Sequence, residues 1–86
     1  MPIISYFFGI YIKMFFDEHN PPHFHAEYGE FKAEINIKTG EIVSGNLPTR
    51  AIRFVEEWRL EHVDELMEDW NMARDNMLPK KIKPLE

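Results

Sequence analysis

Apolar residues in the first half of the chain gather in short runs of the kind that form β-strands. Residues 3–8 and 10–16 are rich in Ile, Phe and Tyr, which favour half-buried or buried strands. Gly9 separates the two runs and fits either a tight turn or a kink within one long strand. In both interpretations the chain begins in a β-sheet.

The next two runs, 23–28 and 31–37, predict a hairpin with a defined register. They flank Gly29-Glu30, a Gly-first dipeptide suited to a two-residue type II′ turn. Across that turn the apolar pairs are Tyr28 with Phe31, Ala26 with Ala33, and Phe24 with Ile35. The opposite face pairs Glu27 with Lys32, His25 with Glu34, and His23 with Asn36. A slip of one residue would bury the charged set, so the register is strongly specified.

The second half of the chain changes to helical periodicity. Lys38-Thr39-Gly40 predicts a last hairpin turn, and a short strand over 41–44 follows it. Between residues 48 and 77, residues that would lie on one face recur at helical spacing. This stripe consists of Ala51, Val55, Trp58, His62, Leu66, Trp70 and Ala73. No glycine or proline interrupts this segment, which predicts one long helix, either straight or bent near residues 59–61.

Together these elements predict a single α+β domain over residues 1–86. An antiparallel β-meander of four to five strands, within residues 3–45, is covered by one long or bent C-terminal helix over 48–77. A tail over 78–86 follows, and Ile82 and Leu85 are the residues that would dock it. An exposed edge strand would also suit a homodimer, and so would the surplus apolar residues of the helix. These residues are Met67, Trp70, Met72 and Met77.

The loop before the third run concentrates the histidines of the chain. Three of the four histidines fall within the segment HNPPHFH, residues 19–25. Pro21 and Pro22 lack an amide hydrogen and restrict the backbone, so the loop should be stiff. Strand alternation then places His23, His25 and Glu27 on one side, with consecutive members about 6.5–7 Å apart at the backbone.

This arrangement predicts a candidate site for a divalent metal ion. The proposed ligands are His19, His23 and His25. Asp17 or Glu18 could add an oxygen ligand, and Glu34 could accept the free ring N–H of His25. Zn, Ni, Mn and Fe are all compatible with imidazole and carboxylate ligands.

The same face also fits a surface that contacts another ligand or a partner protein. Its residues are His19, Asn20, His23, His25, Glu27 and Glu34. Histidines at alternate strand positions are common without a metal, because cross-strand partners such as Lys32 for Glu27 can satisfy such side chains.

A third hypothesis is RNA cleavage, in which one imidazole accepts a proton and another donates one. His62, alone on the apolar stripe, is interpreted as a packing residue.

Charge and composition narrow these hypotheses. Fifteen acidic and ten basic residues give a net charge of −5, which opposes nucleic-acid binding over the surface as a whole. Arg50, Arg53 and Arg59 are interpreted as part of a solvated helix face. The chain contains no cysteine, which excludes disulfides and thiolate chemistry. Lys13 breaks the apolar N-terminal run before membrane-spanning length, so we expect a cytoplasmic protein without membrane association.

Nearly the whole chain resembles a known prokaryotic family, and its most specific element is HNPPHFHA at residues 19–26. The family is domain of unknown function 4160, from bacteria and archaea. The resemblance implies a small stand-alone protein, often encoded beside a small protein of the type called domain of unknown function 2442. It therefore favours a binding module that acts on a protein partner in a toxin–antitoxin-like or regulatory pair. The alternatives are a metal-binding domain that would catalyse hydrolysis and a ribonuclease that would use the histidines. These hypotheses leave open whether the protein is an enzyme.

Overall fold

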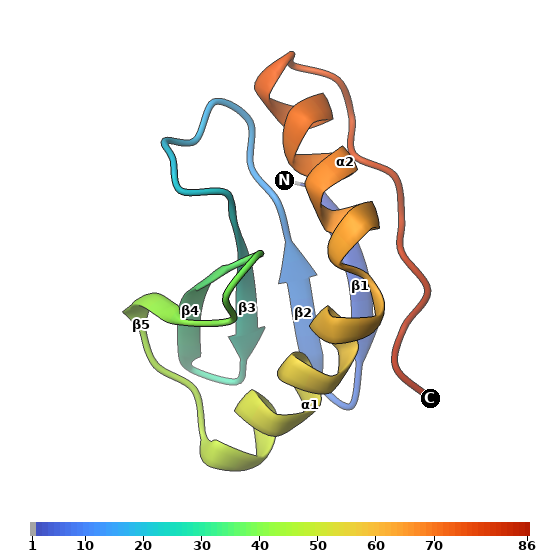
Figure 1. Cartoon of the computed structure of the whole chain (residues 1–86). Coiled ribbons are helices and arrows are strands. Elements are labelled where there is room, and N and C mark those ends of the chain that lie inside the picture. Colours follow the sequence, from blue (N-terminus) through green and yellow to red (C-terminus); the bar gives the residue numbers. More distant parts are fainter. Residues whose placement is uncertain (1) are drawn as a thin grey trace.

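The computed structural model describes residues 2–86, and Met1, the first residue of the predicted domain, lies outside the described residues. The elements in chain order are β1 (Ile3–Phe7), β2 (Ile10–Lys13), β3 (His23–Tyr28), β4 (Phe31–Asn36), β5 (Ile42–Gly45), α1 (Thr49–Glu61) and α2 (Val63–Arg74). The five strands form one antiparallel sheet in the order β1-β2-β3-β4-β5 (Figure 1). The predicted α+β class and antiparallel meander are confirmed, with five strands.

Tight turns set the register of the sheet. Phe8 and Gly9 form a two-residue turn between β1 and β2, with φ of 51° and 81°, so Gly9 marks a turn and not a kink. The second strand ends at Lys13 and not at residue 16 as expected. Gly29 has a φ of 57°, and the pairing of β3 with β4 follows the predicted register at every position.

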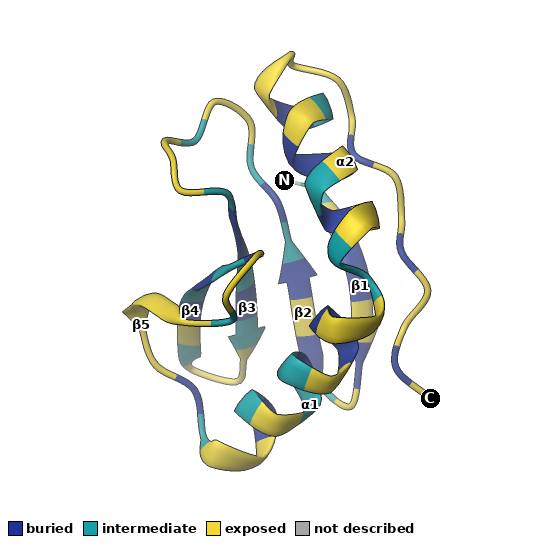
Figure 2. Cartoon of the chain, viewed as in Figure 1, coloured by how far each residue is buried: buried dark blue, intermediate teal, exposed yellow. Residues whose placement is uncertain are grey.

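Both helices pack on the apolar face of the sheet (Figures 1 and 2). The indole of Trp58, on α1, is fully buried, and its ring centroid lies 5.4 Å from that of Phe7 and 5.8 Å from that of Phe24. Burial of these large aromatic side chains supplies much of the hydrophobic stabilisation of the fold. The core therefore lies between α1, α2 and the inner face of the strands.

The prediction of one long or bent helix over 48–77 is wrong, because two separate helices occupy this segment. A straight helix of that length would extend about 45 Å, whereas the longest dimension of the molecule is 33 Å. The chain breaks at His62, which has φ of −132° and ψ of 23°, and α2 then covers another part of the sheet. The ring of His62 packs on Trp58 at 5.4 Å between centroids, and its Nδ1 lies 2.6 Å from a carboxylate oxygen of Glu65.

Two residues assigned to the helix surface are in fact buried. Arg59 is only 4% exposed, and its guanidinium donates to both carboxylate oxygens of Glu56 and to the backbone oxygen of Ile37. These charged hydrogen bonds raise the pKa of Arg59 and lower that of Glu56. Trp70 is only 1% exposed, so it belongs to the core and not to a surface available for self-association.

The C-terminal tail docks along β1, and β5 forms the opposite edge of the sheet. Ile82 and Leu85 are buried, and the amide of Ile82 donates to the carbonyl of Ile4 at 2.7 Å. The indole Nε1 of Trp58 donates to the carbonyl of Lys83 at 2.9 Å. All four residues of β5 are exposed. None of the helices within residues 2–86 has the length and apolar character needed to cross a membrane.

Candidate metal centre

The two histidines of β3 project from the same side of the strand, as their spacing predicts. His23 opens β3 directly after Pro22, and His25 follows two positions later. Their ring centroids lie 5.3 Å apart, with an angle of 60° between the ring planes. The two imidazoles therefore converge and do not diverge along the strand.

The imidazole of His23 is buried and held in one orientation. It is 5% exposed, and its ring centroid lies 5.1 Å from that of Trp70 on α2. Its Nδ1 lies 2.7 Å from the carbonyl oxygen of Pro21. Because a carbonyl oxygen only accepts hydrogen bonds, Nδ1 carries a proton, and in the neutral ring Nε2 has a free lone pair. That Nε2 atom is buried and has no hydrogen-bond partner among the described residues.

Glu18 brings a carboxylate from the preceding loop to both imidazoles. Its Oε1 pairs with Nε2 of His25 and lies 3.3 Å from Nε2 of His23. The three potential ligand atoms all lie within 4.8 Å of one another. Glu18, His23 and His25 are named the His/Glu cluster below.

A second carboxylate borders the His/Glu cluster. Glu34 is the cross-strand neighbour of His25 in the register, and we expected it to accept the ring N–H of that residue. Its Oε1 instead lies 3.5 Å from Nε2 of His23. A cavity of about 270 Å³ opens beside His25 and Glu34, with Lys32, Ser44 and Gly45 on its other walls. The cluster therefore has open space next to it.

Other predicted site residues lie outside the His/Glu cluster. His19 and Asn20 are exposed on the loop. Glu27 lies on the same face of β3, but its carboxylate pairs with the ammonium group of Lys13 at 3.0 Å and not with Lys32. Glu18, considered in the sequence only as an additional oxygen ligand, takes the place that the sequence suggested for His19.

The helix that covers His23 also holds a buried acid. Asp69 precedes Trp70 on α2, is 1% exposed, and accepts the backbone N–H of Lys80 at 2.9 Å. Burial raises the pKa of Asp69 to about 6, since desolvation disfavours the charged form. The contact between Asp69 and Lys80 ties α2 to the start of the C-terminal tail. It thereby helps to keep Trp70 against His23.

Comparison with known proteins identifies the family of the chain. The family model described as Domain of unknown function (DUF4160) matches residues 9–71. This stretch includes the whole His/Glu cluster, Glu34 and Trp70. No curated protein and no solved structure gives a significant match. Since the matched residues make up most of the chain and contain the HNPPHFHA segment, the chain belongs to the DUF4160 family.

Proposed function

We propose that this protein binds a divalent transition-metal ion through the Nε2 atoms of His23 and His25 and the carboxylate of Glu18. The observation that carries the proposal is the buried Nε2 atom of His23, which has no hydrogen-bond partner in the part of the chain that the structure describes and faces the other two groups. Leaving a buried acceptor unsatisfied costs about 1–3 kcal/mol. Coordination of a metal ion would remove that penalty.

The hydrogen bond on the other side of the His23 ring supports the same proposal. Metal-binding histidines commonly donate their second ring N–H to a backbone carbonyl or a carboxylate, which fixes the tautomer and aims the lone pair. The carbonyl of Pro21 has this role for His23. The rigid loop would therefore prepare the ring before any ion arrives.

Distances within the His/Glu cluster suit a small ion after minor side-chain movement. Tetrahedral coordination at 2.0–2.1 Å requires ligand atoms about 3.3 Å apart, and Oε1 of Glu18 is already 3.3 Å from Nε2 of His23. Two imidazoles and one carboxylate are compatible with Zn, Ni, Mn or Fe. A water molecule in the neighbouring cavity, or the carboxylate of Glu34, would complete the coordination.

Calorimetric titration of the tag-free, chelator-treated protein with Zn²⁺ tests the proposal. We expect one ion per chain, and we expect His25→Ala to abolish saturable binding, because it removes a ligand from a partly exposed position. His19→Ala is the matched control, since it removes an exposed histidine of the same loop and should leave binding unchanged. Absence of saturable binding in the wild type, or equal losses in the two variants, would contradict the proposal.

Binding of a protein partner is a second candidate function, and the open edge of β5 favours it. Ile42 and Val43 expose 39% and 47% of their surface there. An uncovered edge strand with apolar side chains can pair with an extended segment of another protein. Co-expression with a protein of the DUF2442 type, the neighbour that the family resemblance suggests, should give a complex of fixed stoichiometry. Val43→Lys should weaken this complex, and failure to form it with the wild-type chain would argue against that partner.

A further inference from the structure

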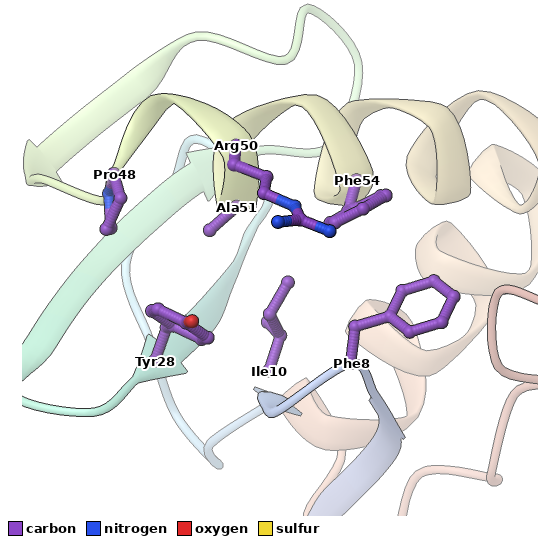
Figure 3. Close-up of a pocket in the computed structure, with 7 residues that line it drawn as sticks. All are labelled: Phe8, Ile10, Tyr28, Pro48, Arg50, Ala51 and Phe54. Atoms are coloured by element: carbon purple, nitrogen blue, oxygen red, sulfur yellow. The ribbon is translucent and has the colours of Figure 1, made fainter.

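A second cavity lies at the other end of β3, remote from the His/Glu cluster. It has a volume of about 340 Å³ and opens between the turn that follows β1 and the first turns of α1. The side chains of Phe8, Ile10, Ala51 and Phe54 form apolar walls, and Tyr28 and Arg50 contribute polar groups (Figure 3). This volume is within the range of cavities that hold small molecules.

Aromatic rings form one side of this cavity and remain partly exposed. The ring centroids of Phe8 and Phe54 are 4.8 Å apart, and Phe8 is 53% exposed. The φ of 51° at Phe8 is unusual for a bulky residue in a type I′ turn, where Asn is preferred. The turn thus presents an apolar ring at the mouth of the cavity where a polar residue would fit the backbone better.

Among the described residues that line this cavity, Arg50 alone carries a positive charge. Its guanidinium carbon lies 5.5 Å from the centroid of the Phe54 ring, and the side chain extends over the cavity (Figure 3). Within residues 2–86 no carboxylate forms an ion pair with Arg50, and the first turn of α1 contains no acidic residue. Arg50 is exposed, so its guanidinium is free to pair with an anionic ligand.

We infer that this cavity binds a small aromatic carboxylate. A single ring would pack between Tyr28 and the aromatic side of the cavity, where burial of apolar surface favours it. The carboxylate would pair with the guanidinium of Arg50, whose planar donors match its two oxygens. The combination of a ring-sized apolar space and one unpaired cation selects an anionic ring over a neutral one. The inference does not depend on metal binding.

Titration of the metal-free protein with phenylacetate, followed by amide NMR shifts, tests this inference. We expect a saturable response at Phe8, Tyr28, Ala51 and Phe54, with a Kd on the order of 0.1–1 mM for a ligand of this size. Phenylacetamide has the same shape without the charge, and it should bind about tenfold more weakly. Arg50→Gln should weaken phenylacetate binding by the same factor.

Arg53→Gln is the matched control, because it removes the same charge from α1 at a residue that does not line the cavity. It should change the Kd less than twofold. No saturable shift up to 10 mM phenylacetate, on the order of ten times the weakest expected Kd, would overturn the inference. Equal binding of phenylacetamide or equal effects of the two arginine variants would overturn it too. Tighter binding of N-acetylphenylalanine amide, which mimics a phenylalanine within a peptide and has no carboxylate, would assign the cavity to a protein segment and would overturn the inference.

Discussion

The two ends of β3 carry chemically opposite sites on one short strand. At the end that begins with His23, polar groups come together beside Trp70 of α2, and a buried nitrogen of His23 has no hydrogen-bond partner within residues 2–86. At the end that finishes with Tyr28, an apolar cavity beside α1 has the guanidinium of Arg50 at its wall. Along the strand, His25 alternates with Phe24 and Ala26, whereas His23, at the first position of the strand, reaches Trp70 of α2.

The difference shows two ways in which a small fold can build a site. The His/Glu cluster comes from one continuous segment, in which a stiff loop leads into a strand and backbone groups orient the side chains. The apolar cavity is assembled from three distant segments, around residues 8–10, 28 and 48–54, and exists only once the helix docks on the sheet. The first site should therefore respond to metal ions, and the second should respond to changes in the packing of α1.

The largest expected effect is stabilisation by metal at the histidine end alone. At a free Zn²⁺ concentration a hundred times the Kd, binding adds about 2.7 kcal/mol to the free energy of unfolding. For a domain of this size the melting temperature should rise by about 10 °C or more. Thermal unfolding of the wild type and Arg50→Gln should show this shift, and His25→Ala should not. An equal shift in all three proteins would mean that the ion acts elsewhere.

Replacement of the buried acid on α2 should raise stability at neutral pH. The pKa of Asp69 is about 6 in the folded protein, above its ordinary value of 3.8, so the folded state binds a proton more tightly than the unfolded state. Stability from this group is present below pH 4 and is lost as the pH rises to about 6. Asp69→Asn keeps the acceptor for the Lys80 amide and removes this loss. It should gain about 2 kcal/mol at pH 8 and almost nothing at pH 4.

Denaturant titrations of Asp69→Asn and the wild type across this pH range would measure the gain. Glu68 and Glu65 also contribute to the raised pKa of Asp69, and Lys80 lowers it. Because Asp69→Asn leaves these three neighbours unchanged, the difference in stability between the two proteins reports the titration of Asp69. A difference between the proteins that does not change with pH would show that Asp69 does not titrate in this window.

Removing the charge of Glu18 should weaken metal binding by about tenfold, which corresponds to about 1.4 kcal/mol. Glu18→Gln keeps the size of the side chain but removes its anionic oxygen from both imidazoles. Glu27→Gln is the control on the same face, because Glu27 pairs with Lys13 outside the His/Glu cluster. In Zn²⁺ titrations, the control should change the Kd for Zn²⁺ less than threefold. Similar losses in both variants would indicate a general effect of surface charge.

The smallest expected effect is at the turn beside the apolar cavity. Phe8→Asn places the preferred residue in a type I′ turn and removes the contact with Phe54. These effects oppose each other, so the free energy of unfolding should stay within about 1 kcal/mol of the wild type. Denaturant unfolding measures this directly. A larger loss would mean that Phe8 is part of the core and not a wall of an open cavity.

Local patterns in the sequence predict the sheet well, because alternation and turn chemistry act over a few residues. The register from Tyr28–Phe31 to His23–Asn36 follows from Gly29-Glu30 and the apolar face alone. The periodic pattern allowed a bend near residues 59–61, but it could not predict a complete break at His62, since the break depends on the size of the sheet that the helices must cover and not on a glycine or proline. Helical periodicity placed Trp58 correctly in the core but could not show that Arg59 would be buried with Glu56.

The candidate site was predictable only in part for a similar reason. Strand alternation predicts that His23 and His25 point the same way, and the structure brings them together. The loop conformation decides that Glu18 and not His19 reaches them, and no periodic pattern encodes that choice. The cavity beside Arg50 had no local signal, because its lining residues are far apart in the chain.

The central claim is that the Nε2 atoms of His23 and His25 and the carboxylate of Glu18 meet at one metal-binding point. Nitrogen-15 NMR of the histidine rings at pH 7.5, before and after addition of one equivalent of Zn²⁺, tests it most directly. We predict that His23 is protonated at Nδ1 in the free protein and that the Nε2 signals of His23 and His25 alone shift on binding. Protonation of His23 at Nε2, or Nε2 signals that do not respond to Zn²⁺, would contradict the claim.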